Sequence, residues 1–317
     1  MDGLLEDASH CDGILNLWKP PGMTSHDVVS AVRRLTGQRR VGHAGTLDPM
    51  AEGVLVVGIG QGTRLLEYLA GGTKEYCARM HLGVATDTDD AEGKPLSVTA
   101  VKRFRRLTIE RALSAFVGRQ EQRPPVYSAL KQHGQPAYRL ARAGLEVKQT
   151  ARTIEIESIR LVSWQNPHIV CHVTCSKGTY IRSLARDVGA RLGCGAHLCG
   201  LVRLRSGAFR LEGAVPLPLL AHALQEGYWQ QVVLAADAAL QDHPALILGS
   251  EDDMRLRQGK DIVLAQPPAT DALNIQPWRA YNGDGELVAL LVRSDHDSRW
   301  HGIKVFPSTY GPDLQHN

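Results

Sequence analysis

The stretch VGHAGTLDPMAEG, residues 41–53, places one aspartate, Asp48, among small and apolar residues, five positions after His43. The acids nearest to it along the chain are Glu52 and the more distant Asp27. Hydrolysis of a glycosidic bond usually needs two carboxylates. A metal centre needs several ligands, and His43 has no second ligand at a useful spacing. We therefore expect Asp48 to work as a carboxylate without an acidic partner, and we expect no metal.

The segment SKGTYIRSL, residues 176–184, joins a loop to the start of a helix. Free backbone N–H groups and the helix dipole favour an anion at such a point. Arg182 nevertheless lies in the first turn, where the dipole disfavours a cation. An anion is therefore expected beside Arg182: an RNA phosphate, a carboxylate such as Asp48, or both. The alternative is a solvated arginine on the flank of the helix.

Tyr76 lies near the start of KEYCARMHLG, residues 74–83, in which apolar and polar residues alternate. This alternation is typical of a half-buried strand, where a tyrosine is by default part of a core or an interface. A more specific interpretation is that Tyr76 faces a cleft and offers a flat surface on which a nucleobase stacks.

A glycine-rich turn in VLVVGIGQGTRLL, residues 54–66, suggests a dinucleotide site. Gly58, Gly60 and Gly62 follow a strand, but the third glycine of G-x-G-x-x-G would fall on Thr63. The following KEYCARMHLG strand also looks antiparallel rather than part of a second parallel unit. A nicotinamide-binding enzyme is therefore an alternative hypothesis, to be tested by NAD or NADP binding.

The six cysteines are too few for a disulfide scaffold. Cys171 and Cys175, like Cys194 and Cys199, lack the usual spacing of zinc ligands. Cys171 and Cys175 lie an even number of residues apart and would share one face of a strand. This favours small buried hydrophobic residues over a metal site.

Charge is distributed unevenly along the chain. Residues 102–152 carry twelve Lys or Arg against three Glu, a net charge of +9, whereas the rest of the chain sums to −6. Aromatic side chains, Tyr127 and Tyr138, lie within the same segment. Many separate cations with aromatics suit a polyanion better than a small metabolite. The alternative is a solvated basic face.

The composition is that of a globular protein with about two domains. The 317 residues are 43% hydrophobic and 22% charged, and no apolar run approaches a membrane span. Residues 1–13 are acidic and lack the core of a signal peptide. We expect a cytoplasmic protein without a membrane segment.

Hydrophobic periodicity predicts strands and helices that hold these residues. Strands are expected at 14–18, 53–60, 74–82 and 168–175, and helices at 25–36, 108–117 and 179–193. Residues 119–152 look like a long irregular arm, and 86–95 an acidic loop. Residues 245–317 are predicted to form a small all-β unit with a hairpin at NGDG (282–285). The expected division is an extension at 1–12, a catalytic domain at 13–244 and a C-terminal domain at 245–317.

Four blocks together resemble the bacterial TruB family of tRNA pseudouridine synthases. They are KPPGMTSHDVV (19–29), GHAGTLDPMAEGVL (42–55), GTKEYCARMHLGVATDTDDAEG (72–93) and CSKGTYIRSLARDVGARLGCGAHLCGLVRLRSG (175–207). They occur in the family's order and span most of residues 14–215.

The resemblance implies an α+β fold and a substrate. The fold is a mixed, largely antiparallel central sheet with flanking helices, an RNA-gripping insertion at about 119–152, and a C-terminal PUA-like β-barrel. The implied activity is conversion of uridine 55 in the T-loop of tRNA to pseudouridine. The resemblance implies no metal and no organic cofactor, tRNA as partner through its T-stem-loop, and a monomer without an obligate protein partner.

The resemblance also gives the central residues their roles. Pseudouridine formation breaks a C–N glycosidic bond, turns the uracil and rejoins it through carbon, so one ionised carboxylate suffices. Asp48 would be that carboxylate, either attacking C1′ or removing a sugar proton to give a glycal. Arg182 would pair with Asp48 and lower its pKa. Tyr76 would stack on the uracil and is a candidate for removing the C5 proton.

Five further residues are implied to bind the substrate. His43 would hold the target nucleotide out of its stack, Tyr180 and Leu201 would line the pocket, and Lys19 would support the loop that carries Asp48. Arg64 occupies a position where the family often has lysine, which implies a basic contact. A non-catalytic RNA-binding or RNA-folding protein is the alternative from another class.

Overall fold

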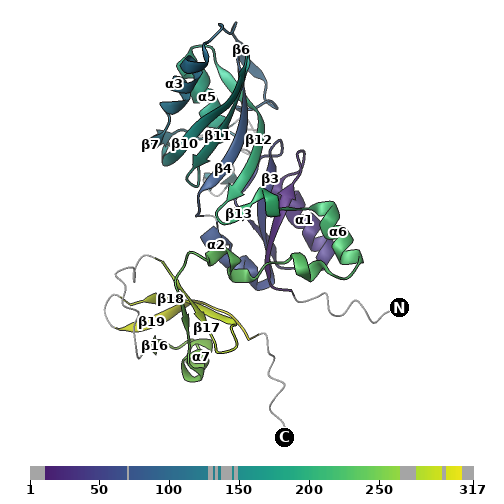
Figure 1. Cartoon of the computed structure of the whole chain (residues 1–317), viewed down its shortest axis with the longest axis vertical. Coiled ribbons are helices and arrows are strands. Elements are labelled where there is room, and N and C mark those ends of the chain that lie inside the picture. The colour runs from purple at the N-terminus through teal and green to yellow at the C-terminus, as the bar shows by residue number, and fades with distance from the viewer. Residues whose placement is uncertain are drawn as a thin grey trace.

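The computed structural model describes residues 11–308 except 70, 128–130, 133–134, 137–144, 146–148, 265–275 and 295–297. The described chain forms one ten-stranded sheet, one five-stranded sheet and two two-stranded ribbons. Figure 1 shows the large sheet extending through the upper part of the molecule, with the smaller sheet below it. No helix of the described chain is long and apolar enough to cross a membrane.

The large sheet is mixed and mostly antiparallel, as predicted. Only the β1–β14 and β12–β3 contacts are parallel among its described pairs. In spatial order its strands are β14 (Val215–Pro216), β1 (Gly13–Lys19), β3 (Glu52–Ile59), β12 (Ala196–Ser206), β4 (Lys74–Leu82), β11 (His168–Cys175), β10 (Arg152–Gln165) and β7 (Gly118–Gln122), with β2 (Val41–Ala44) beside β3 and β13 (Phe209–Arg210) beside β12.

The α-helices are short and lie against this sheet or within the C-terminal unit. Helix α1 has Thr24 as its N-cap, with a capping box to Asp27, and ends at Gly37, as its sequence predicts. The α-helices are α1 (Ser25–Thr36), α2 (Leu66–Leu69), α3 (Arg106–Ser114), α5 (Ile181–Leu192), α6 (Leu217–Gln225) and α7 (Ser250–Arg257).

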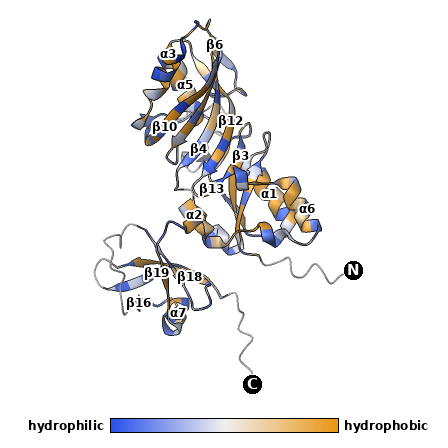
Figure 2. Ribbon diagram, viewed as in Figure 1, coloured by the Kyte–Doolittle hydropathy of each residue, from blue (hydrophilic) through white to orange (hydrophobic). Residues whose placement is uncertain are grey.

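The helices cover the large sheet through hydrophobic clusters. Helices α1 and α6 pack on β1 and β3, and Figure 2 shows hydrophobic residues gathered in these helices. Helices α3 and α5 pack on β4, β10 and β11. Helix α5 turns Leu184, Ala185 and Val188 inward as predicted. Burying a valine or leucine side chain of this kind contributes about 1.5–3 kcal/mol.

Strand β4 shows how the sequence places a functional residue. Its alternate residues from Lys74 to Leu82 are buried, so Tyr76 shares an inward face with Ala78 and Met80. In β11 the same alternation buries Cys171 and Cys175, which are free cysteines, as predicted.

Two element boundaries differ from the prediction. Helix α3 begins at Arg106 rather than Thr108 and ends at Ser114, because Gly118, at φ +106°, starts strand β7 instead of ending the helix. Residues 118–122 pair with 152–156 in the large sheet. The predicted irregular arm therefore begins after Gln122, and within it β8 (Lys131–Gln132) pairs with β9 (Gln135–Pro136).

The acidic loop lies within a second ribbon. Strand β5 (Val84–Thr86) pairs with β6 (Pro95–Val98), and the turn between them contains Asp87, Asp89 and Asp90. Asp90 is 4% exposed, and Thr86 donates its hydroxyl to the Asp90 carbonyl at 2.7 Å. The predicted acidic loop is therefore present as the turn of a ribbon, with Asp90 folded back against the protein.

The C-terminal unit is a curled half-barrel sheet, as expected for a PUA-like domain, but it is not all-β. The NGDG hairpin is confirmed between β17 and β18, while α7 lies in a segment that we predicted to be β structure. The strands, in spatial order, are β15 (Ala245–Ile247), β17 (Trp278–Tyr281), β18 (Leu287–Arg293), β19 (Arg299–Val305) and β16 (Ile262–Val263).

The glycine-rich turn after β3 is used for packing. Gly60 to Leu65 form a 3₁₀ helix, and a Cβ on Gly62 would lie 2.1 Å from the Gly13 carbonyl oxygen. The next strand, β4, does not pair in parallel with β3. These glycines therefore allow close contact with β1, which accounts for them without a dinucleotide.

The two halves of the large sheet meet where β3 runs parallel to β12. Gly53 adopts a φ of +104°, and a Cβ there would lie 2.3 Å from the Arg203 carbonyl oxygen. An L-residue at this position would be both strained and in steric conflict with backbone.

We predict that Gly53→Ala lowers the free energy of unfolding by roughly 2 kcal/mol or more, from strain and overpacking together. Thermal and urea unfolding would measure it. Gly213→Ala is the matched control, because the nearest neighbour of its added Cβ is Asn16 Nδ2 at 3.6 Å, an ordinary contact. Equal stabilities for the two variants would contradict the close approach of Gly53 to the Arg203 backbone.

Candidate active site

Asp48 lies in the loop between β2 and β3, and this loop is tied to helix α1. The Leu47 N–H donates to Ser25 Oγ at 2.8 Å, and the Ser25 hydroxyl donates to the Leu47 carbonyl at 3.2 Å. These two contacts fix the backbone beside Asp48 from the first turn of the helix.

Lys19, at the end of β1, contacts the same loop through its ammonium group. Its ammonium donates to the carbonyls of Met23 at 2.6 Å, Pro20 at 2.9 Å and Pro49 at 3.2 Å. The side chain is fully buried, and burial lowers its pKa to about 8, although the nearby Asp48 opposes this shift. The predicted contact between Lys19 and the Asp48 loop is present.

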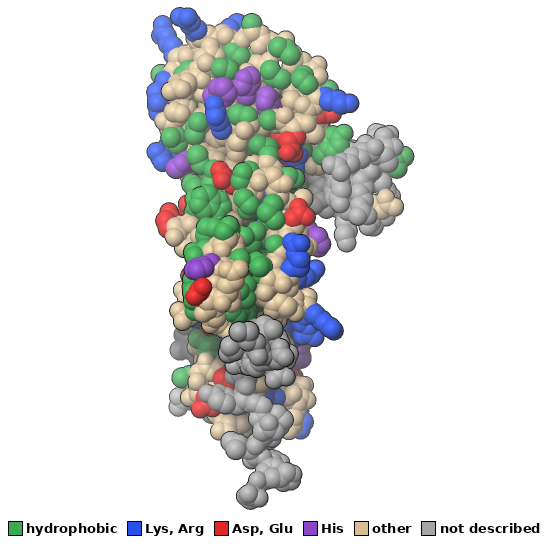
Figure 3. Space-filling view, turned by 90° about the vertical axis from the view of Figure 1, so that its right-hand side faces the viewer, with side chains coloured by type: hydrophobic (Ala, Val, Ile, Leu, Met, Phe, Trp, Pro, Cys, Tyr) green, Lys and Arg blue, Asp and Glu red, His purple; other side chains and the backbone are tan. Residues whose placement is uncertain are grey.

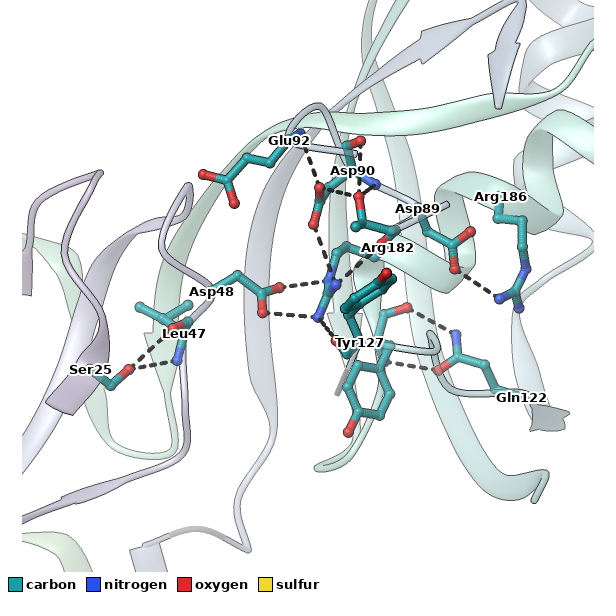
Figure 4. A network of polar contacts seen from close by, with 12 residues as sticks. Ser25, Leu47, Asp48, Asp89, Asp90, Glu92, Gln122, Tyr127, Arg182 and Arg186 are labelled. Atoms are coloured by element: carbon teal, nitrogen blue, oxygen red, sulfur yellow. Dashed lines mark hydrogen bonds and ion pairs between the residues drawn. The ribbon is translucent and has the colours of Figure 1, made fainter. Parts of the chain in front are cut away.

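Arg182, in the first turn of α5, pairs with Asp48 (Figure 4). Arg182 Nη2 donates to Asp48 Oδ1 at 3.0 Å, and Arg182 Nε lies 2.9 Å from Asp48 Oδ2. One hydrogen bond and one close ion-pair contact therefore hold the carboxylate beside the guanidinium. Of the anions expected beside Arg182, the structure therefore supplies the carboxylate.

Arg182 also binds a second carboxylate, which the sequence analysis did not identify. Arg182 Nη1 donates to Asp90 Oδ2 at 3.3 Å and to the Thr88 carbonyl at 3.2 Å. Asp90 also accepts from the Thr88 hydroxyl at 2.6 Å. The expectation that Asp48 has no acidic partner was wrong, because the β5–β6 turn brings Asp90 to the same guanidinium.

The pKa of Asp48 reflects its burial and the charges of Arg182 and Asp90. Burial raises the pKa, the Arg182 guanidinium lowers it, and the charge of Asp90 raises it further, so the net direction is upward. The predicted lowering by Arg182 is present but is outweighed. The Asp48 side chain is 31% exposed, so the carboxylate still faces open space.

A cavity of about 260 Å³ opens beside Asp48. Its wall is formed by residues 45–48 and 176–182, Lys74, Tyr76, Leu201 and Arg203. Five of the predicted site residues line it together: Asp48, Tyr76, Tyr180, Arg182 and Leu201. Four separate segments of the chain therefore build one site.

Tyr76 and Tyr180 are held by different means. Tyr76 is 8% exposed on β4, and burial raises the pKa of its phenol while the nearby charge of Arg203 opposes the rise. The Tyr180 backbone is clamped by Gln122, whose amide accepts from the Tyr180 N–H at 2.8 Å and donates to its carbonyl at 3.0 Å. The Arg152 guanidinium lies 5.7 Å from the centre of the Tyr180 ring.

Three predicted binding residues do not line this cavity: Lys19, which supports the Asp48 loop, His43 and Arg64. His43 lies on β2 opposite Val57, and burial lowers its pKa. Arg64 donates to the Val305 carbonyl at 2.6 Å and lies 4.9 Å from the centre of the Phe306 ring, so it joins the two sheets of the protein. Substrate binding by His43 and Arg64 stays a prediction.

Lys74 and Arg203 are cavity residues that the sequence analysis missed. Arg203 Nε donates to the Val54 carbonyl at 2.7 Å and Nη2 to the Gly45 carbonyl at 3.1 Å. A sequence signal existed: Lys74 is two residues from Tyr76, and Arg203 two residues from Leu201, so each cation shares the inward face of its strand.

A larger, more open hollow of about 600 Å³ lies in the C-terminal unit between α7 and the β17–β18 turn. Its Arg257 lies 2.6 Å from Asp253 and 3.5 Å from Glu286, so two carboxylates already neutralise it. We therefore place the candidate active site at the cavity beside Asp48. Within the described residues, no cluster of His, Cys, Asp or Glu is arranged to hold a metal ion.

The chain is similar to known proteins over nearly its whole length. Residues 33–181 match the N-terminal domain of the TruB family of pseudouridylate synthases, and 182–241 match the C-terminal domain of tRNA pseudouridylate synthase B. The tRNA pseudouridine synthase B of Dehalococcoides mccartyi (strain BAV1) is 41% identical over 93% of this chain and 96% of its own length. That of Syntrophotalea carbinolica is 43% identical over 90% and 99%.

A solved structure supports the same relationship. The chain matched in a crystal structure of a Cbf5–Nop10–Gar1 complex superposes with a TM-score of 0.72 at 26% identity, covering 93% of this chain and 84% of that one. The chain belongs to the TruB family of pseudouridine synthases.

Proposed function

We propose that this protein converts uridine 55 in the T-loop of tRNA to pseudouridine, with Asp48 as the single catalytic carboxylate. The observation that carries the proposal is the Asp48 carboxylate, held by Arg182 at the wall of a cavity. The relatives named tRNA pseudouridine synthase B support tRNA as the substrate. Asp90 shares Arg182 but is buried to 4% exposure, so Asp48 is the acid with access to a substrate.

The reaction needs only groups that the cavity provides. The C1′–N1 bond breaks and its electron pair goes to the uracil, while Asp48 either attacks C1′ or removes a proton from the sugar. The uracil turns and its C5 bonds to C1′, while Asp48 leaves C1′ or its proton returns to the sugar. The C5 proton is then lost and N1 gains a proton. Nothing is consumed, so the proposed reaction requires no cofactor. Tyr76 would carry the uracil while it turns, because its ring forms part of the cavity wall.

Access requires the target nucleotide to leave its stack. Extruding a base costs a few kcal/mol, which RNA contacts elsewhere must offset. The basic segment can supply them and is tied to the site: Arg182 Nη2 donates to the Tyr127 carbonyl at 2.9 Å, and Arg186 Nη2 donates to the Arg123 carbonyl at 3.0 Å. The RNA-gripping arm would therefore start from the residues that hold the catalytic pair.

We predict that Asp48→Asn abolishes pseudouridine formation in an unmodified T-stem-loop RNA while tRNA affinity stays within about twofold of the wild type, because one neutralised carboxylate removes no phosphate contact. Base-resolved pseudouridine mapping and filter binding measure the two properties. Asp242→Asn, at an exposed carboxylate outside the site, is the control. Retained activity in Asp48→Asn would refute the proposed chemistry. Binding without activity in the wild type would favour a purely RNA-binding protein.

We predict that the acid limb of the kcat/KM profile lies above the ordinary aspartate range, because Asp48 must be ionised and its pKa is raised. Activity is therefore lost as the pH falls through this raised pKa. Asp90→Asn removes a like charge that raises the pKa of Asp48, so it should move the limb to lower pH. Asp89→Asn is the control, because Asp89 pairs with Arg186 at 2.9 Å. A shift to higher pH in Asp90→Asn would contradict this electrostatic account.

We predict that tRNA affinity falls steeply with salt, with a slope of roughly 0.7–0.9 per neutralised phosphate. Figure 3 shows Lys and Arg side chains at the upper end of the molecule. Lys102, Arg103 and Arg105 are exposed in the basic segment. Replacing all three with Gln should flatten the slope of log Kd against log salt. An unchanged slope would locate the docking surface elsewhere.

A further inference from the structure

Two buried cations flank Tyr76 in the wall of the cavity. Lys74 precedes Tyr76 by two residues on the inward face of β4, and Arg203 of β12 lies directly opposite Tyr76 in the strand register. Both line the cavity that Asp48 lines. Lys74 is 5% exposed and Arg203 is 1% exposed.

The carboxylates near these cations are engaged elsewhere. Asp48 and Asp90 pair with Arg182, and Glu75 lies 2.6 Å from Arg205. Lys74 Nζ donates to the Leu69 carbonyl at 3.4 Å, which is a long contact. Arg203 binds two backbone carbonyls, which are neutral. The described partners of Lys74 and Arg203 are therefore neutral carbonyl dipoles and not anions.

Two buried cations without a counter-charge destabilise the protein unless an anion binds beside them. Burying a cation without a counter-charge is unfavourable, and burial lowers the pKa of Lys74 to about 8, with the Arg203 charge adding to the effect. Removal of Lys74 would relieve this cost in the empty protein. An anion entering beside both cations would be strongly stabilised, because the surroundings contain little water to screen it.

Pseudouridine formation generates an anion in the cavity, if the proposed function is correct. When the C1′–N1 bond breaks, its electron pair passes to the uracil ring and spreads over the two carbonyl oxygens. The electron pair returns to C1′ when C5 bonds to it. Loss of the C5 proton and protonation of N1 then restore a neutral ring, so the step needs no co-reactant. The anion exists only between these events.

We propose that Lys74, assisted by Arg203, stabilises the uracil anion released by cleavage of the C1′–N1 bond. Fixed positive charge, placed where negative charge develops, lowers the barrier without reorganisation at the moment of reaction. A backbone phosphate is the less suitable occupant for Lys74, because phosphates remain near the mouth of a cavity that admits a flipped base. Lys177, which is exposed and also lines the cavity, is better placed for a phosphate.

The test is whether Lys74 matters most when uracil is a poor leaving group. Lys74→Met keeps the length of the side chain and removes the charge. Single-turnover consumption would be compared for T-stem-loop RNAs carrying uridine or 5-fluorouridine at position 55, since fluorine makes the departing uracil more acidic. We expect a loss of about 10²-fold with uridine, a clearly smaller loss with 5-fluorouridine, and recovery of much of the rate in Lys74→Arg.

Controls separate this role from structure and from RNA binding. Thermal unfolding reports whether Lys74→Met folds, and Lys74→Gln serves in its place if it does not. Lys177→Met should weaken RNA binding and reduce both rates by the same factor. Equal losses on the two substrates in the Lys74 variant, or no loss, would overturn the proposal, as would a loss confined to RNA affinity. An inactive wild type would instead refute the proposed function.

Discussion

The site depends on one guanidinium that is shared by two carboxylates. Arg182 is almost fully buried, and a buried cation of this kind is stable only with counter-charges and hydrogen-bond acceptors around it. It has them from three segments that are distant in sequence: Asp48, the β5–β6 turn with Asp90, and the Tyr127 carbonyl at the start of the arm. Removing any one of these partners would leave Arg182 with less counter-charge or one acceptor fewer, so Arg182 couples the Asp48 loop to the basic segment that we propose to bind RNA.

The large sheet makes this convergence possible by bringing two halves of the chain into contact. Asp48 lies in the loop between β2 and β3 in one half, whereas Tyr76 and Arg182 belong to β4 and α5 in the other. The halves join through β12, where Gly53 permits contact with the Arg203 backbone. Arg203 then reaches back with its side chain to the carbonyls of Val54 and Gly45. The seam therefore sets the distance between the carboxylate and the surface on which a base would lie.

Strand alternation and the helix dipole, which act within a few residues, predicted the features of the site that depend on neighbouring residues. The alternation of β4 gave the inward face of Tyr76, and the dipole argument at α5 gave an anion beside Arg182. Asp90 was missed because its contact with Arg182 spans 92 residues, and an acidic loop ordinarily looks solvated. The helix α7 was missed because its short segment, rich in acids, resembles a turn. Arg64 was assigned by family position alone, and tertiary packing places it against Phe306.

The charged residues of the cavity fall into two groups with different proposed roles. Asp48 has a pKa raised by burial and by Asp90, which makes it a stronger base and nucleophile once it is ionised, while Arg182 keeps ionisation within reach. Lys74 and Arg203 line the same cavity and, among the described residues, bind backbone carbonyls rather than a carboxylate. Cleavage of a glycosidic bond moves electrons from the sugar toward the base. The proposed arrangement, with Asp48 at the sugar and Lys74 and Arg203 beside the base, favours that movement.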